Sequence, residues 1–317
     1  MTKRFLLLPF LLVPALAVWG SNCDGSGNCY IRAAAAGTRD GSSWTNACSG
    51  FAGACAPSNM TRGVIYWVAA GSYSSATFNT AASGSTNITI RAAAPSNHGP
   101  AGDWNSGFAG LATISGVNYI TTPYWIFDGQ SRGADWRSGY NFHFINSTDG
   151  SNAPFVISAA NLTFQYLDIQ GTTNRTGPSY NDNGILATAS ANNLYVGYCY
   201  VHETGNTQFQ LNYGTSNNAT FEYNYIYLNH TGQNDTHDEA FSITYSNLII
   251  RFNVMQDIMW TAFISDANCC TPNLSNWDIY GNVFYWDSAY ASGSYTPFLG
   301  NGIVGLTGEN WSGYLHF

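Results

Sequence analysis

The stretch Leu248-Ile-Ile-Arg-Phe-Asn-Val-Met255 decides the fold, because four other segments of the chain align with it without gaps. A fixed core that recurs every 25 to 32 residues is typical of a solenoid, in which one unit stacks on the next and the connecting loops differ in length. The sequence therefore predicts an all-β chain, folded as a right-handed parallel β-helix of short strands stacked rung on rung. The four other segments are Leu162–Ile169, Leu194–Val201, Ala219–Ile226 and Trp277–Phe284.

The columns of this alignment predict which side chains point inward. The third column (Phe164, Val196, Phe221, Ile250, Ile279) and the eighth column (Ile169, Val201, Ile226, Met255, Phe284) are apolar throughout. Such columns are expected to stack between rungs at a spacing of about 4.8 Å. The sixth column ends in Asn224, Asn253 and Asn282, which predicts a buried ladder of side-chain amides. The fifth column (Tyr166, Tyr198, Tyr223, Phe252) predicts an aromatic stack.

Outside the repeat the pattern is less regular. Residues 87–91, 124–129 and 141–145 alternate in the same manner as the aligned strands. The clearest helical signal is a cap at Ser42 or Ser43, which predicts a short helix that runs to about Ala54. We divide the chain into a signal peptide (1–20), an N-terminal cap with the first strands (21–84) and the β-helix (85–317).

The first residues read as a secretory signal. Lys3 and Arg4 precede an apolar run from Phe5 to Val18, and Ala15-Leu-Ala17 is a small-x-small cleavage site. The run is short for a membrane span, and no later segment is long and apolar enough to cross a bilayer. We therefore expect a secreted or cell-surface protein without a membrane span.

The amino-acid composition limits the classes of molecule that the protein is expected to bind. Only 9% of the residues are charged and the net charge is −8. Lys3 is the only lysine and lies within the signal, so the mature surface is anionic and a poor match for nucleic acid. No lysine remains to serve as a base or a Schiff-base nucleophile.

Seven cysteines fit an exported protein. Two local disulfides, Cys23–Cys29 and Cys48–Cys55, are plausible from spacing, and the crossed pairing 23–48 with 29–55 stays open. Cys199 lies in an apolar strand and is expected to be a buried free thiol. Cys269 and Cys270 are adjacent, which leaves a vicinal disulfide and separate thiols equally open.

Three N-terminal motifs carry a resemblance to a known superfamily. Cys29-Tyr-Ile-Arg32, Asp40-Gly-Ser-Ser-Trp-Thr-Asn-Ala47 and Gly63–Tyr73 are similar to the N-terminal cap of secreted, pectate-lyase-like parallel β-helix proteins. The superfamily includes polysaccharide lyases, some glycosidases and many surface proteins, so the resemblance implies a fold more than a reaction. The paired-aspartate motifs of polygalacturonases are missing. Strand-like residues run to Phe317 without a polar cap, which predicts a fragment, a capping partner or end-to-end self-association.

Titratable residues concentrate on two loops that follow the same aligned strand. One loop carries His202 and Glu203, and the other carries Asp235, His237, Asp238 and Glu239 together with His230. Because equivalent loops of a coil are neighbours, these residues are expected to border one groove. Carboxylates near histidine suit acid–base chemistry on a glycosidic bond or calcium binding, with Asp235, Asp238 and Glu239 as the calcium ligands. Solvated loop residues are the alternative reading.

Arg251 is a further candidate. It should face outward beside Glu222 of the preceding rung. The resemblance implies an outward arginine that acts as the base next to bound calcium. A plain Glu222–Arg251 ion pair, which would be worth little at a surface, is the other reading.

Asp168, Tyr200 and Tyr225 form an outward column on which sugar rings could stack.

Two functional hypotheses follow from the sequence patterns. One is an enzyme of the lyase or glycoside hydrolase type that acts on an extracellular polysaccharide. The other is a non-catalytic adhesin, glycan-binding module or fibre-forming assembly protein. An extracellular glycan is the expected partner in the first case and a possible one in the second.

Overall fold

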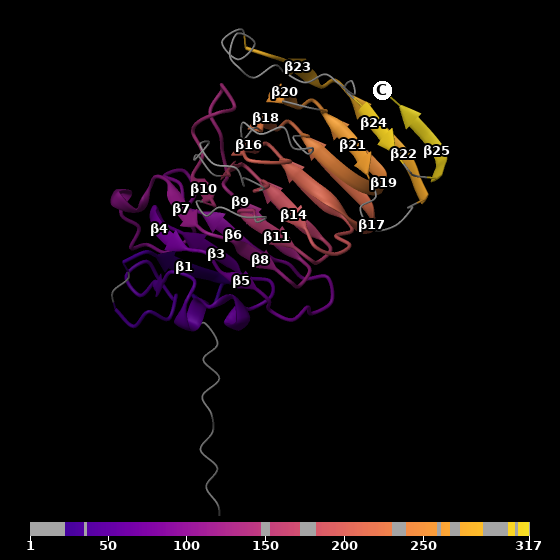
Figure 1. Ribbon diagram of the computed structural model, residues 1–317. Coiled ribbons are helices and arrows are strands. Elements are labelled where there is room, and N and C mark those ends of the chain that lie inside the picture. Colours follow the sequence, from indigo (N-terminus) through magenta and orange to yellow (C-terminus); the bar gives the residue numbers. More distant parts are fainter. Residues whose placement is uncertain are drawn as a thin grey trace, which may run out of the picture.

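The computed structural model describes residues 23–34, 37–146, 153–171, 182–229, 239–258, 261–266, 273–287, 304–307 and 310–316. The signal segment 1–20 lies outside them. The described chain is a parallel β-helix, which coils from the indigo N-terminal end to the yellow C-terminal end (Figure 1). Its only described helices are short 3-10 turns: η1 (Gly53–Cys55), η2 (Pro57–Asn59) and η3 (Ser106–Phe108).

Two parallel sheets form the walls of the coil. The small sheet has eight strands, and the larger has 17 because long strands bend around one corner and join two rows of strands. The small sheet contains β4 (Gly71–Ser74), β7 (Ala112–Ser115), β10 (Phe142–Ile145), β13 (Leu167–Gln170), β16 (Tyr200–Thr204), β18 (Tyr225–Asn229), β20 (Val254–Ile258) and β23 (Val283–Tyr285).

The large sheet carries the remaining strands. Its first row contains β5 (Thr77–Phe78), β8 (Asn118–Ile120), β11 (Phe155–Ile157), β14 (Ile185–Ala187), β21 (Phe263–Asp266) and β24 (Val304–Thr307). Its second row contains β2 (Cys48–Ser49), which pairs with β1 (Asn28–Arg32), and then β3 (Ile65–Val68), β6 (Ile88–Ala92), β9 (Trp125–Asp128), β12 (Leu162–Gln165), β15 (Leu194–Gly197), β22 (Asn273–Tyr280) and β25 (Asn310–His316). The strands that bend through both rows are β17 (Phe209–Glu222) and β19 (Phe241–Arg251).

Strand pairing confirms the repeat alignment. Leu194 pairs with Leu162 on one side and with Ala219 on the other, and the pairing continues from Ala219 to Leu248 and then to Trp277. All five aligned segments are therefore in the register that the sequence predicts. Ring stacking is confirmed as well, since the centroids of Tyr166, Tyr198, Tyr223 and Phe252 follow one another at 4.8, 5.1 and 5.2 Å.

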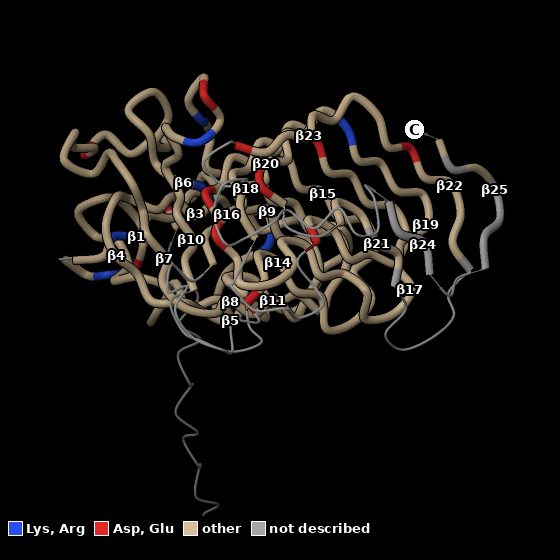
Figure 2. Tube along the Cα trace, turned by 45° about the horizontal axis from the view of Figure 1, so that its top comes forward, with Lys and Arg blue, Asp and Glu red and all other residues tan. Residues whose placement is uncertain are grey.

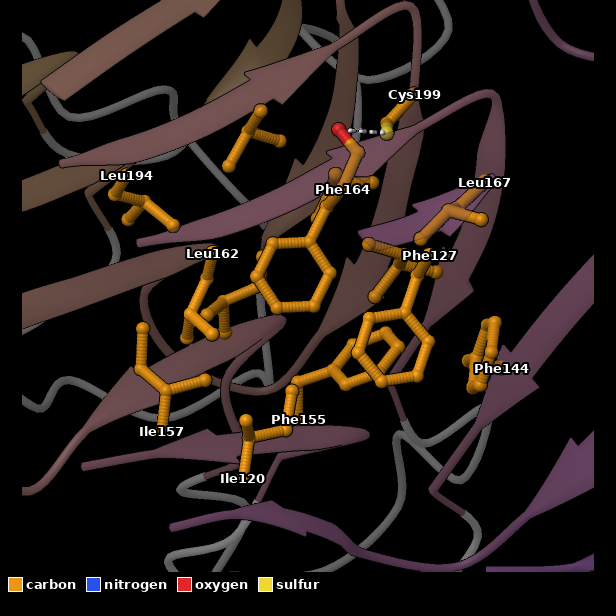
Figure 3. Packing of buried hydrophobic residues seen from close by; sticks show 14 of the residues in the cluster. Ile120, Phe127, Phe144, Phe155, Ile157, Leu162, Phe164, Leu167, Leu194 and Cys199 are labelled. Carbon is orange, nitrogen blue, oxygen red and sulfur yellow. Dashed lines mark hydrogen bonds between the residues drawn. The ribbon is translucent and has the colours of Figure 1, made fainter. Parts of the chain in front are cut away.

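The core fills the coil with the predicted apolar columns. Phe164, Phe127 and Phe155 are fully buried and lie in ring contact with one another (Figure 3). Burial of one such ring stabilises the fold by about 2 kcal/mol. The free thiol of Cys199 lies in the same core, as predicted, and burial raises its pKa to about 12.

The asparagine ladder is also confirmed. The Nδ2 of Asn224 donates to Oδ1 of Asn253 at 2.9 Å, and Asn253 donates to Asn282 in the same way at 2.9 Å. Asn224 and Asn253 are fully buried. Each amide also donates to a backbone carbonyl of the turn, so the ladder satisfies polar groups that burial would otherwise penalise.

The N-terminal segment differs from the prediction at one point. Cys23–Cys29 and Cys48–Cys55 form the local disulfides, which excludes the crossed pairing. The prediction of a short helix up to Ala54 is wrong: residues 41–52 form bends, turns and strand β2, and the 3-10 turns η1 and η2 follow. Ser43 accepts a hydrogen bond from Asn46 N, but Trp44 and Ala47 are both buried in one small cluster with Tyr30 and Trp67, and this tertiary packing holds the segment as bends.

Candidate functional site

The outer face of the small sheet gathers polar and aromatic side chains into two columns. In the first, strand register places His143 beside Asp168, Asp168 beside Tyr200 and Tyr200 beside Tyr225. The second column lies two residues further along each strand and contains Gln170, His202, Tyr227, Gln256 and Tyr285. Alternation along a strand explains the pattern, because residues two apart point to the same face.

His202 lies between two carboxylates. Its Nε2 is 2.8 Å from Oδ1 of Asp168, and its Nδ1 is 3.4 Å from Oε2 of Glu203. Burial lowers the pKa of His202, but the hydrogen bonds and negative charges of Asp168 and Glu203 outweigh it and raise the pKa overall. When it is protonated, the ring can donate from both nitrogens, one to each carboxylate.

Glu203 is fixed by its backbone and by a second donor. Its φ of 54° is left-handed, a conformation that costs a non-glycine residue about 1 kcal/mol and that recurs at the equivalent residues of the next two rungs, Leu228 and Asp257. The Nε2 of Gln170 donates to Glu203 Oε2 at 2.5 Å, and the Oε1 of Gln170 is 2.9 Å from His143 Nε2. Asp168, His202, Glu203, Gln170 and His143 thus form one hydrogen-bonded chain across β10, β13 and β16.

Aromatic rings cover this chain on one side. Tyr200 stacks on the His202 ring with centroids 3.9 Å apart, and Tyr227 is nearly parallel to Tyr200 at 6.5 Å. Burial raises the pKa of Tyr200, and the neighbouring charges of Asp168 and Glu203 raise it further, so the phenol stays neutral. The stack covers one face of the His202 ring and leaves flat ring surface along the sheet.

A second polar cluster continues along the same sheet toward β23. The hydroxyl of Tyr225 is 2.5 Å from both Gln256 Oε1 and the hydroxyl of Tyr285. Gln256 donates to Asp257, which also accepts from the backbone N–H of Asp287. Burial raises the pKa of Asp257, although these two bonds oppose the shift.

The loop of residues 129–141, which joins β9 to β10, overhangs this face. Arg132 donates to the carbonyl of Tyr223, and its guanidinium lies 3.9 Å from the Trp136 ring centroid and 5.2 Å from that of Tyr198. Arg137 is exposed and lies 5.6 Å from the Tyr225 ring centroid. The loop therefore brings a cation to the edge of the columns on the small sheet.

The structure brings together only part of the predicted site. His202 and Glu203 are in contact, as their position on one rung suggested. Glu239 is fully buried and accepts a hydrogen bond from Thr207 Oγ1 at 2.8 Å. Asp235, His237, Asp238 and His230 lie outside the described residues, so their convergence with His202 stays a prediction.

Arg251 occupies the other sheet. It ends β19 and bonds Glu222 through Nε at 2.7 Å and Nη2 at 2.5 Å, while Nη1 is 3.0 Å from the Tyr280 hydroxyl. Tyr195 donates to the second oxygen of Glu222 at 2.9 Å. The ion pair between adjacent rungs is present as the sequence suggested. Figure 2 shows how sparse such charged residues are along the coil.

The described residues do not supply the calcium site. Nowhere in the described ranges do three His, Cys, Asp or Glu side chains gather as a metal ion would require. Of the three expected ligands, Glu239 is bonded to Thr207 and the other two lie outside those ranges. No described helix is long and apolar enough to span a membrane.

Sequence reasoning missed His143 and Gln170 and did not join Asp168 to His202. The strand register contained the signal: Gln170 aligns with His202, so Asp168 lies diagonally opposite His202, within reach of a long side chain.

Comparison with protein families, curated proteins and solved structures finds no match for this chain.

Proposed function

We propose that the chain is an extracellular protein that binds a polysaccharide along the small sheet and cleaves it with Asp168 and Glu203. The observation that carries this proposal is the His202 ring held between the two carboxylates on a face lined by tyrosines. The pectate-lyase-like resemblance agrees with a glycan substrate. The two disulfides agree with an oxidising environment.

The chemistry follows from the pair of carboxylates. Cleavage of a glycosidic bond needs an acid that protonates the leaving oxygen and a base that activates water or removes a proton from the sugar. The His202 ring fills the space between Asp168 and Glu203, so in this proposal the sugar lies on the outer face of the sheet, over the ring and the two carboxylates. Hydrolysis and β-elimination both use such a pair, and the proposal covers both. No step uses calcium or Arg251.

Tyrosine rings supply the binding surface. Tyr200 and Tyr227 are nearly parallel and half-buried, and a sugar can stack on such faces for about 1 kcal/mol each. Because strands of the small sheet are stacked in register, an extended polymer can follow the coil across several rungs.

The test is depolymerisation of a panel of extracellular polysaccharides, with and without a chelator. The release of reducing ends and of unsaturated ends is measured. Asp168→Asn and Glu203→Gln should each lower kcat about 100-fold or more, the usual size of an acid–base contribution. Asp278→Asn is the matched control, since Asp278 contacts His316 on the large sheet, at 3.2 Å, and should leave kcat within about twofold.

Full activity in either carboxylate variant would refute the assignment. Binding without cleavage by the wild type would favour the second candidate, a glycan-binding module. The specific observation behind that candidate is that both His202 nitrogens are already occupied. In that case Tyr200→Ala and Tyr227→Ala should weaken binding while Asp168→Asn should not abolish it.

A further inference from the structure

The hydrogen-bonded chain on the small sheet has a defined direction. An ionised carboxylate can only accept, so Gln170 must present its Nε2 to Glu203. The other end of the same amide, Oε1, can only accept and faces His143 Nε2 at 2.9 Å. His143 must therefore carry a proton on Nε2 as long as Glu203 is ionised.

Protonation of Glu203 reverses the donor–acceptor direction of the hydrogen bonds from Glu203 through Gln170 to His143. A carboxylic acid donates, and Gln170 must then turn its amide over so that Oε1 accepts from the Glu203 hydroxyl. Its Nε2 then donates to His143 Nε2, which must be unprotonated, with the ring proton on Nδ1. The change at His143 exchanges its protons with water, one leaving Nε2 and one entering Nδ1. Each arrangement satisfies all three residues, and mixed ones leave two donors or two acceptors facing each other.

We infer that Gln170 and His143 are positioning residues that couple the ring-proton position of His143 to the charge on Glu203. For its catalytic consequence this inference rests on the proposed function, in which Glu203 must gain and lose a proton in each turnover. The charged groups that face these residues are His202, whose Nδ1 lies 3.4 Å from the same Oε2 of Glu203 that Gln170 contacts, and Asp168, which lies beside His143 in the register. The coupling itself runs through the Gln170 amide.

A purely structural role is a poorer account of this arrangement. His143 and Gln170 are only half-buried on an outer sheet face, where water could satisfy their polar atoms. Packing alone would not require the two side chains to align end to end.

The test is nitrogen-15 NMR of the histidine rings in the full chain, which distinguishes the two neutral ring forms without any substrate. The His143 signals are assigned by their loss in His143→Leu. With Glu203 ionised, wild-type His143 should show Nε2–H, and Gln170→Met should release it to a mixture of forms. Thr113→Val is the matched control, since Thr113 pairs with His143 on the neighbouring strand. It should leave the wild-type pattern.

Kinetics provide the second readout. Gln170→Met and His143→Leu should lower kcat about tenfold with KM unchanged. His143→Gln should restore most of it, because a glutamine amide can donate or accept where Nε2 lay. An Nδ1–H form in the wild type, or an identical pattern in Gln170→Met, would overturn the coupling. The expected NMR pattern in a protein that cleaves no polysaccharide would uphold the coupling and reject the proposed function.

Discussion

Each of the two sheets of this coil carries one carboxylate cluster, and the two clusters differ in how many carboxylates surround each basic side chain. On the large sheet Glu222 meets one guanidinium, and tyrosine hydroxyls complete the set. On the small sheet a single histidine ring meets two carboxylates, so even the protonated ring leaves one excess negative charge. The His202 side chain is only 10% exposed, whereas that of Arg251 is 35% exposed.

This difference separates a structural pair from a candidate site. A salt bridge with matched charges at the surface adds little to the free energy of folding, and it leaves no net charge for a ligand to neutralise. An unbalanced cluster around a buried ring holds charge that the fold alone does not need, and such arrangements concentrate at functional sites.

The largest expected effect comes from removal of the buried ring. His202→Leu nearly keeps the volume but leaves Asp168 and Glu203 without the ring that both of them contact. Loss of one partner of a buried ionic cluster costs about 3–5 kcal/mol, and partial exposure of the carboxylates reduces this to about 2–3 kcal/mol of unfolding free energy. Urea denaturation measures it. A loss no larger than that of a surface mutation would show that the cluster is solvated.

A smaller effect should appear in the pH dependence of stability. The folded pKa of His202 is raised, so its stabilising contribution is fully present below about pH 6.5, the ordinary value of histidine, and is lost as the pH rises through the folded pKa. The free energy of unfolding of the wild type should therefore fall across this window. The same series in His202→Leu should lack that part of the slope, and an unchanged slope would contradict the assignment.

The smallest effect is expected on the large sheet. Arg251→Met should cost less than about 1 kcal/mol, because the guanidinium is partly exposed and water can replace its contacts. The hydrogen bonds that Arg251 donates to Tyr280 and Glu222 raise the pKa of Arg251, so its guanidinium does not titrate near neutrality. Arg251→Met should keep the wild-type pH dependence of the unfolding free energy. If it lowered the unfolding free energy more than His202→Leu does, the large-sheet cluster would be the more important of the two.

Much of the fold could be read from the sequence because its repeat is periodic. The columns headed by Phe164 and Ile169 set the inward faces, and Asn224, Asn253 and Asn282 fixed the register of the turn. The site was harder to predict, since it depends on contacts between columns. Asp168 meets His202 diagonally, and the spacing of a repeat shows which residues are neighbours without showing which of them bond. The bends at residues 41–52 follow tertiary packing of Trp44, which overrides a local capping signal.

The loop of residues 129–141 has a consequence for how the coil opens. In a solenoid each rung touches only its neighbours, so rungs can fray one at a time. Arg132 leaves the rung of β9 and contacts Tyr198 and Tyr223, two and three rungs further on. We expect the rungs from β10 to β18 to open together, so their amides should exchange hydrogen at one common rate and Arg132→Ala should split it. A surface that opens only as a unit keeps the spacing of Asp168, His202 and Glu203 intact until the whole block is lost.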